Sequence, residues 1–389
     1  MTVWDDLVGQ EPAVAVLKRA VAGAAARLKG GSGAATAGMT HAWLITGPPG
    51  SGRSNAGRAF AAALQCDTQG CGECKSCRTA LSGAHPDVSL IRTELLSIRV
   101  SEIRELVRRA AMSPTQGRWQ VMVVEDADRL TEQAADALLK SIEEPAPRTV
   151  WVLCAPTVED VVPTIRSRCR LLVLRTPPVT AVAEMLTSKA GVEPELAGFA
   201  ARAAQGHIGR ARALARDEEV RSRRTKVLEV PFELRDLGAC LNAAQRLVDA
   251  AKEESKASAA KVDERERSEL EQALGMGTKG AKPRETAAAL KELEDQQKAR
   301  AKRWERDVLD RSLVDLMALY RDVLVLQTRA GAELINAELS RNIEQLASRT
   351  SPEQTIRRID ALTGCREAIE GNVAPLLALE AMTIALFEG

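Results

Sequence analysis

Four cysteines within a short stretch of the chain carry its clearest chemistry. They follow the spacing Cys66-x4-Cys71-x2-Cys74-x2-Cys77. Four thiolates that converge on one ion are a ligand set of structural zinc, which is bound tetrahedrally and without an open position. An iron–sulfur cluster is the alternative, since C-x2-C-x2-C also occurs there, but the usual following Cys-Pro is missing. We therefore expect a structural zinc module over residues 66–77.

A glycine-rich segment over residues 47–54 has the spacing of a phosphate-binding loop. It reads Gly-Pro-Pro-Gly-Ser-Gly-Arg-Ser and fits G-x-x-x-x-G-K-[S/T] except at the lysine position. The backbone N–H groups of such a loop cradle phosphate at the N-terminus of the next helix. A glycine turn that merely joins strand to helix is the alternative, and the fit argues against it. The candidate nucleotide-binding residues here are Gly47, Gly50, Gly52, Arg53 and Ser54.

Two acidic residues could complete this nucleotide site. Glu125 and Asp126 directly follow an apolar run that ends at Val124. ATPases of this type usually have Asp then Glu there, one for Mg²⁺ and one to orient the attacking water. The reversed order misplaces both carboxylates. Arg53 places a planar guanidinium group where the motif has the compact ammonium group of lysine. We expect a degenerate ATP and Mg²⁺ site with absent or weak hydrolysis.

A third group of candidate residues is basic. Ser167, Arg168 and Cys169 lie within the arginine-rich run 166–170, after a predicted strand and short helix. Such a run often forms only a solvated surface. At this place in a phosphate-loop fold, an arginine can instead reach the nucleotide of a neighbouring subunit and stabilise charge on the transferring phosphoryl group. We predict this role in trans for Arg168.

The elements that must position these residues can be predicted from apolar runs and glycine-rich turns. Strands over 42–46, 88–91, 120–124, 150–154 and 171–174 alternate with helices over 11–28, 53–65, 100–111, 131–143 and 158–166. Strands separated by helices indicate an α/β fold with a parallel sheet covered on both faces. After Pro177-Pro178 the chain is almost wholly helical, with a small alanine-rich bundle over 179–217 and a larger region over 218–389.

The larger helical region contains two charged arms that flank a Gly/Lys/Pro turn from Gly275 to Pro283. We interpret them as a solvated helical hairpin and assign no chemistry to their charges. The second arm continues into an apolar stripe whose spacing of three and four predicts one buried helix face. The stripe consists of Leu309, Leu313, Leu316, Tyr320 and Val323.

Composition narrows the possible functions. A length of 389 residues suggests two or three domains. A net charge of +1 argues against a protein that coats nucleic acid by bulk electrostatics, and 3% aromatic residues supply few stacking platforms. No apolar run could span a bilayer, and the acidic opening lacks the cationic start of a signal peptide. We therefore expect a cytoplasmic protein, in which clustered cysteines indicate metal binding and not disulfides.

Together these motifs resemble the clamp-loader subunits of bacterial replicases, and within that family the delta-prime type. From residue 1 to about 175 the resemblance consists of many matching motifs. Beyond that point only the domain architecture is similar. It rests on Val8-Gly9-Gln10, the phosphate loop, the four cysteines, His85-Pro86-Asp87, residues 136–145 and Ser167-Arg168-Cys169.

The resemblance implies an AAA+ phosphate-loop domain over residues 1–176 that carries the zinc module. It further implies a small helical lid over 177–217 and an all-α collar over 218–389, with a charged insertion at about 250–305. Through the collar the chain would join a hetero-pentamer with gamma/tau and delta subunits. Through that complex it would act on the sliding clamp and primer–template DNA. No membrane partner is expected. Such a subunit is a stator that does not hydrolyse ATP, while Arg168 completes the active site of the adjacent gamma/tau subunit. In the lid segment 206–210, glycine stands where an active subunit has its sensor arginine.

Two other functions stay open at the level of sequence. A self-sufficient AAA+ ATPase of gamma/tau type would turn over ATP alone, in a reaction that depends on Ser54 and Glu125. A zinc-dependent DNA-binding module would bind DNA tightly and with strong salt dependence, which the net charge and the few aromatic residues disfavour. The leading hypothesis is a non-hydrolysing clamp-loader subunit that helps place the sliding clamp on primed DNA.

Overall fold

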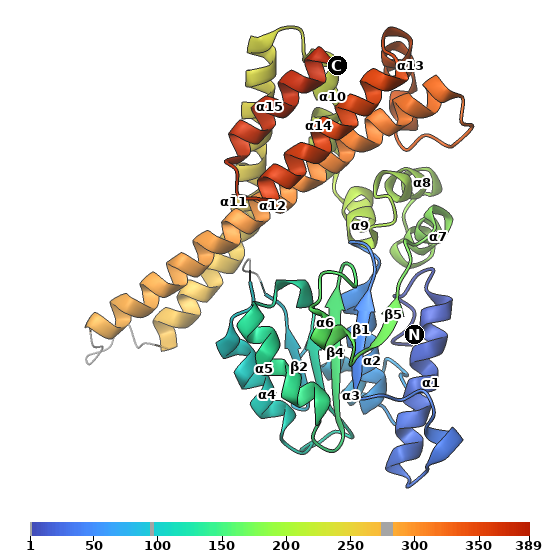
Figure 1. Ribbon diagram of the computed structural model, residues 1–389, viewed down its shortest axis with the longest axis vertical. Coiled ribbons are helices and arrows are strands. Elements are labelled where there is room, and N and C mark those ends of the chain that lie inside the picture. Colours follow the sequence, from blue (N-terminus) through green and yellow to red (C-terminus); the bar gives the residue numbers. More distant parts are fainter. Residues whose placement is uncertain (1, 94–96, 274–282) are drawn as a thin grey trace. The chain divides into compact units, whose positions relative to one another are not determined.

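The computed structural model describes residues 2–93, 97–273 and 283–389 (Figure 1). The chain divides into two compact units, residues 1–216 and 217–389. The turn predicted from Gly275 to Pro283 lies outside the described residues, except for Pro283, where a helix begins. No helix in the described ranges is both long enough and apolar enough to cross a membrane.

The first unit is built on a five-stranded parallel sheet with the strand order β2-β3-β4-β1-β5. The central strands are buried along their whole length because helices cover both faces, which explains their unbroken apolar sequences. In register, Leu44 lies opposite both Leu153 and Leu171. The strands are β1 (Ala42–Thr46), β2 (Val88–Ile91), β3 (Gln120–Val124), β4 (Thr149–Ala155) and β5 (Arg170–Val173). The predicted α/β fold with a parallel sheet is confirmed.

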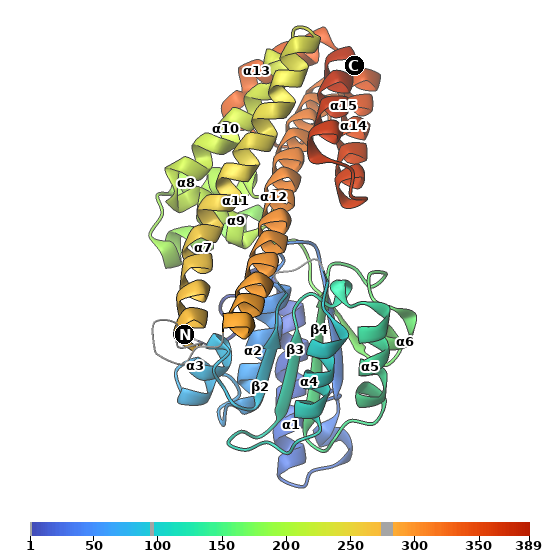
Figure 2. The same ribbon diagram turned by 90° about the vertical axis from the view of Figure 1, so that its left-hand side faces the viewer.

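Helices form a layer on each face of this sheet (Figures 1 and 2). Side chains of α1 (Glu11–Leu28), α2 (Arg53–Gln65) and α3 (Lys75–Ser82) join one core, where Trp43 meets Phe60 edge to face at 5.2 Å between ring centroids. The other core contains α4 (Val100–Ala110), α5 (Glu132–Glu143) and α6 (Pro163–Arg166). Successive β1 residues point to opposite faces, so Trp43 enters the first core and Leu44 the second.

Two helices differ from the sequence prediction. The helix predicted over 158–166 begins only at Pro163. Proline suits a first helical turn because it lacks an N–H, and before it the Asp160 carboxylate accepts the N–H of Thr157 at 2.8 Å in a separate turn. Helix α3 was not predicted, because its polar, cysteine-rich sequence has no clear apolar period.

Three further helices complete the first unit: α7 (Val179–Ala190), α8 (Pro194–Ala203) and α9 (Ile208–Arg216). The chain leading to them is held by Gln10, whose amide donates to the carbonyl of Arg175 at 2.6 Å and accepts the N–H of Arg175 at 3.1 Å. Arg212 of α9 also pairs with Asp6 at 3.1 Å. The start of the chain thereby helps to hold these three helices, which the sequence predicted as a lid, relative to the phosphate loop.

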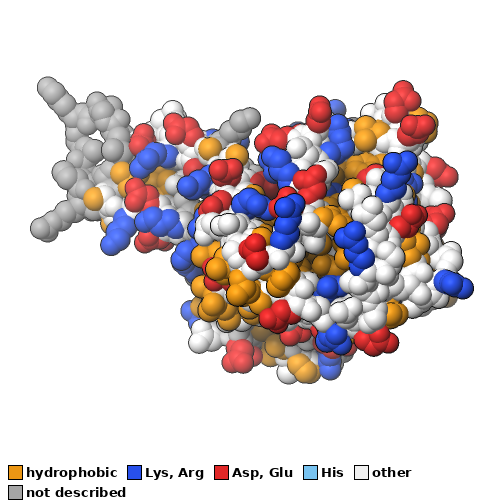
Figure 3. All heavy atoms as spheres, turned by 90° about the horizontal axis from the view of Figure 1, so that it is seen from above, with side chains coloured by type: hydrophobic (Ala, Val, Ile, Leu, Met, Phe, Trp, Pro, Cys, Tyr) orange, Lys and Arg blue, Asp and Glu red, His pale blue; other side chains and the backbone are white. Residues whose placement is uncertain are grey.

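The described residues of the second unit form helices and the turns that join them. Its helices pack around one core of apolar side chains. Every residue of the predicted apolar stripe is buried, and all of them except Val323 belong to this core, which confirms the predicted buried face. Seen from above in Figure 3, acidic and basic side chains are interspersed with apolar ones on the surface. The helices are α10 (Glu218–Glu233), α11 (Leu237–Ala273), α12 (Pro283–Thr328), α13 (Ser340–Arg349), α14 (Pro352–Glu370) and α15 (Pro375–Glu388). Short 3-10 turns lie at Gly33–Thr36, Ala127–Arg129 and Ala337–Leu339.

The charged arms of α11 and α12 pack along each other, but the hairpin is not wholly solvated as the sequence suggested. Arg300 is buried and binds Glu266 through two hydrogen bonds of 2.7 and 2.6 Å, with Asp263 as a further partner. The hydroxyl of Ser255 donates to the carbonyl of Ala301 at 2.8 Å. Part of the charge in these arms therefore joins the two helices.

Candidate functional site

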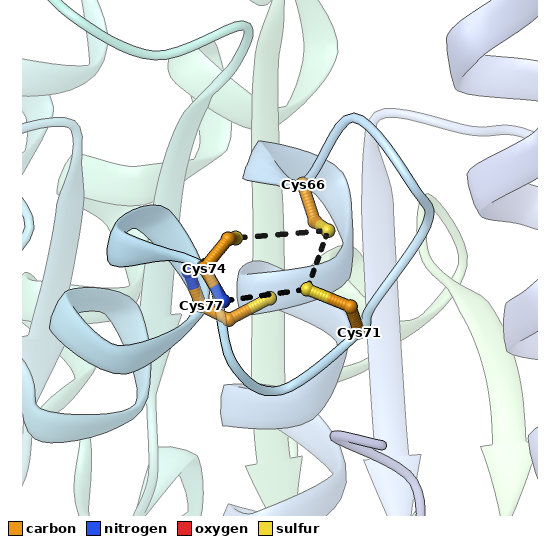
Figure 4. Close-up of side chains that lie close together, drawn as sticks. All are labelled: Cys66, Cys71, Cys74 and Cys77. Carbon is orange, nitrogen blue, oxygen red and sulfur yellow. Dashed lines mark hydrogen bonds between the residues drawn. The ribbon is translucent and has the colours of Figure 1, made fainter. Parts of the chain in front are cut away.

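The four predicted metal-ligating cysteines converge (Figure 4). Their sulfur atoms all lie within 4.8 Å of one another, and Sγ of Cys66 is 3.7 Å from that of Cys71 and 3.8 Å from that of Cys74. Zinc with Zn–S bonds of about 2.3 Å in a tetrahedron requires sulfur separations of about 3.8 Å. Both the donor set and its dimensions therefore fit a metal ion such as zinc.

Backbone N–H groups point at two of the sulfur atoms in this cluster. The N–H of Cys74 points at Sγ of Cys71 and the N–H of Cys77 at Sγ of Cys74, each at 3.4 Å. Burial disfavours the thiolate of Cys66, but hydrogen bonds from Thr68 and from nearby backbone N–H groups outweigh it and lower its pKa to about 6. Burial raises the pKa of Cys77. Thiolate is the form that binds metal, so the loop favours the binding form at Cys66 before any ion arrives.

The cysteine module is anchored at its root to the loop before β3. The Gln65 side-chain oxygen accepts the N–H groups of Arg118 at 2.8 Å and Trp119 at 3.3 Å. The Arg118 guanidinium in turn donates to the carbonyl of Cys66 at 3.0 Å. The module is thus tied to the sheet through residues 118–119.

The His85-Pro86-Asp87 motif holds the same loop. The buried Asp87 carboxylate accepts the N–H and hydroxyl of Thr115 at 2.7 and 2.8 Å, the N–H of Gln116 at 2.9 Å and the N–H of Gly117. Burial opposes ionisation of Asp87, but these hydrogen bonds outweigh it and lower its pKa. The motif therefore has a structural role beside the cysteine module.

The predicted phosphate loop joins β1 to α2 and contacts the lid. Gly50 and Gly52 have φ angles of +81° and +95°, a region that glycine adopts without steric cost. A Cβ atom at Gly50 would lie 2.5 Å from Cα of His207, so the lid backbone approaches the loop closely. Sequence reasoning gave His207 only a structural role, because nothing in its local pattern connects it with a glycine 157 positions earlier.

The charged residues of this site pair with groups of the same chain. The guanidinium of Arg53 donates to the carbonyl of Gly47, and burial lowers its pKa despite the nearby carboxylates. Arg58 of α2 binds Glu125 at 2.5 Å, and the Glu125 side chain is only 4% exposed. Ser54 is the second residue of the same helix, and Asp126 directly precedes the turn after β3, so all the predicted residues lie where β1 and β3 end. Arg58 was missed because an arginine inside a helix resembles an ordinary surface residue.

Arg168 lies between α6 and β5 and is 40% exposed. Its guanidinium binds Glu143 at 2.5 Å and donates to the carbonyl of Thr164 at 2.8 Å and the hydroxyl of Ser167 at 3.2 Å. Cys169 packs against the core of α4, α5 and α6, where burial raises its pKa to about 12. Ser167 and Cys169 thus support the turn, whereas the guanidinium of Arg168 reaches solvent.

Two family models match the chain. The model described as DNA polymerase III, delta subunit, matches residues 31–178, and the model of its C-terminal part matches residues 265–386. Together they account for well over half of the sequence. The chain belongs to the DNA polymerase III delta and delta' subunit family. This confirms the predicted resemblance.

Two delta' subunits are similar to this chain in sequence. The delta' subunit of Pseudomonas aeruginosa is 38% identical over 135 residues, which cover 33% of this chain and 41% of that protein. The delta' subunit of Haemophilus influenzae is 37% identical over 157 residues, 39% of this chain and 48% of that protein. The matches therefore span less than half the length of either relative. A gamma subunit-related protein of Thermotoga maritima is 17% identical over 89% of this chain and 93% of its own, with a TM-score of 0.39.

Proposed function

We propose that this chain is a delta-prime-type, non-hydrolysing subunit of the DNA polymerase III clamp loader. It works in the cytoplasm with gamma/tau and delta subunits, and the complex opens the sliding clamp and places it on primed DNA. Family membership supports the assignment. The observation that carries it is an exposed, anchored Arg168 in a chain whose own phosphate site is degenerate.

The state of the chain's own nucleotide site supports the absence of hydrolysis. Arg53 turns back to the carbonyl of Gly47, where an active site would need a cation directed at the terminal phosphates. Glu125, at the position expected to face Mg²⁺, already pairs with Arg58. A magnesium nucleotide would have to displace both contacts, and the reversed Glu125-Asp126 pair would still misplace the water-orienting carboxylate.

The chemistry of Arg168 suits action on a neighbouring subunit. A guanidinium presents several N–H donors in a fixed plane and binds phosphate oxygens in a bidentate manner. Such an arginine, supplied in trans, stabilises the charge that spreads over the transferring phosphoryl group and raises turnover about 10³- to 10⁵-fold at the site it serves. The role of this chain would then be to complete a gamma/tau active site.

A reconstituted complex of this chain with gamma/tau and delta subunits tests the proposal. Arg168→Ala should remove the DNA-stimulated ATP turnover of the site that borders this chain while the subunits still co-elute. Arg166→Ala is the matched control, because Arg166 is also exposed and lies two positions earlier. Unchanged turnover with Arg168→Ala would contradict the proposal.

We also propose that the four-cysteine cluster binds zinc in a structural role. Metal analysis of the purified chain should find one zinc ion per chain in a colourless protein. Cys74→Ser should bring the zinc content well below one, whereas Cys169→Ser, outside the cluster, should leave it unchanged. Iron with visible absorption would instead establish the iron–sulfur alternative.

The helical unit is proposed as the collar through which the subunits assemble. Large apolar side chains are exposed on α11 and α15, including Leu237 at 57% and Leu377 at 60%. Exposed apolar side chains that gather on a surface are typical of protein–protein contacts. The three-domain division predicted from the sequence, with a lid over 177–217, is part of this proposal.

A further inference from the structure

We propose that Glu143 is a positioning residue for Arg168, one that sets the direction in which the guanidinium faces the neighbouring subunit. The inference rests on the proposed function, in which Arg168 acts in trans. Glu143 is the last residue of α5, and its Oε1 lies 2.5 Å from Nη2 of Arg168. The two residues are 25 positions apart, so only the fold brings them together.

The three contacts of Arg168 differ in the part of the fold to which they tie the guanidinium. The carbonyl of Thr164 and the hydroxyl of Ser167 both accept from Nη1, and both belong to the same turn as Arg168 itself. Glu143 binds the other terminal nitrogen and comes from a different helix. Among the described contacts it is therefore the one that orients the guanidinium relative to the rest of the domain.

This arrangement leaves donors for a ligand. A guanidinium has five N–H groups, and the three contacts use three of them. Two remain, which is the number a bidentate contact with phosphate oxygens needs. Since the side chain is 40% exposed, these donors can be reached from outside the chain.

Stability does not account for this ion pair. Both side chains are about two-fifths exposed, at 40% and 44%, and an ion pair between such groups adds little to folding free energy. Arginine is a long side chain that loses much rotational freedom when it is fixed. An arginine already held in one direction acts without that loss, and small displacements of a reacting group are costly in catalysis. The pair is therefore better explained by orientation of Arg168.

The test compares Glu143→Gln with Glu144→Gln in the reconstituted complex with gamma/tau and delta subunits. Glu144 is the next residue and is also exposed, so it controls for loss of a surface charge. Glu143→Gln should remove roughly half or more of the Arg168-dependent ATP turnover, as a fall in kcat with the KM for ATP unchanged. Glu144→Gln should change neither value.

A double variant separates positioning from a general structural effect. In the Arg168→Ala background, Glu143→Gln should cause no further loss of turnover, because the side chain it positions is gone. The inference is overturned if Glu143→Gln leaves turnover unchanged, raises it, or lowers it equally in both backgrounds. If Arg168→Ala alone has no effect, the proposed function fails and not merely the role of Glu143.

Discussion

Single side chains hold the loops of the first unit, and Asp87 is the clearest case. Its buried carboxylate accepts hydrogen bonds from three consecutive residues, 115–117. A carboxylate that accepts several N–H groups is held in its ionised form. The loop before β3, and through it the root of the cysteine module, therefore depends on the charge of one residue.

Asp87 should make the first unit sensitive to acid. Its pKa is lower in the folded chain than the ordinary value of 3.8 because its hydrogen bonds outweigh the effect of burial. The stabilisation is complete above the unfolded value and is lost as pH falls through the folded one, hence below about pH 4. Asp87→Asn should lower the free energy of unfolding at pH 7 by about 1–3 kcal/mol and flatten its dependence on pH in this acidic range.

Urea unfolding followed by tryptophan fluorescence measures this effect, since Trp4, Trp43, Trp119 and Trp151 all lie in the first unit and only Trp304 in the second. Asp160→Asn is the control, because that carboxylate is exposed and accepts the N–H of Thr157 in a surface turn. Equal losses in the two variants would show that Asp87 has no special role.

At the residue scale, sequence patterns identified side chains that belong to a local motif. The four cysteines and the glycines of the phosphate loop were found because each set is defined by spacing within about a dozen residues. The roles of Arg58, His207 and Glu143 were not predicted, although Glu143 lies in the run 136–145 that carries the resemblance. Each of them acquires its role from a partner brought near only by the fold. Pairings of this kind have no signature in local sequence.

At the scale of elements, the contact between the phosphate loop and the lid depends on the lack of a side chain at Gly50. Gly30 has the same φ of +81°, but a Cβ there would meet nothing within 4 Å. Gly30→Ala should therefore lower the free energy of unfolding by about 1–2 kcal/mol, the cost of this backbone conformation for alanine. Gly50→Ala should cost about 1–3 kcal/mol more, because its methyl group meets the backbone of His207.

The same fluorescence-detected unfolding compares these two variants. The difference between them isolates the loop–lid contact, since the backbone strain is common to both. If the two variants are equally stable, the lid does not press on the phosphate loop in the way the structure shows.

The bounds of most elements were predicted to within a residue or two, because the spacing of apolar residues and the positions of glycine indicate the same ends. Strands β1 and β3 have the predicted bounds, and α5 begins one residue late, after Thr131 accepts the N–H of Ala134 and caps it. Helix α3 escaped prediction because its start depends on a sulfur cap, at which Cys74 accepts the N–H of Cys77. The start of α3 is therefore set in part by the cysteine cluster and not by helix propensity.

At the scale of the whole molecule, a buried charged network joins distant parts of the helical unit. Arg224 of α10 binds Asp315 of α12 at 3.2 Å, and both are about 95% buried. Arg224 also reaches Glu338 at 3.0 Å and Asn336, which donates to Asp322 at 2.9 Å. Buried charges of this kind are tolerated only while every partner is present.

Arg224→Ala should therefore destabilise the helical unit by about 3–5 kcal/mol, because it removes the guanidinium that pairs with the buried carboxylate of Asp315. Arg223→Ala, at the more exposed neighbouring position, should cost less than about 1 kcal/mol. Thermal unfolding followed by circular dichroism at 222 nm measures both. A small effect of Arg224→Ala would mean that water or a rearranged helix satisfies Asp315.

We propose that this chain completes another subunit's ATP site and does not use its own. The most direct measurement is the steady-state ATP turnover of the purified chain alone and of the complex that it forms with gamma/tau and delta subunits. The chain alone should show no turnover above background, and the complex should show turnover that falls with Arg168→Ala but not with Ser54→Ala in this chain. Sustained hydrolysis by the isolated chain, lost on Ser54→Ala, would contradict the account.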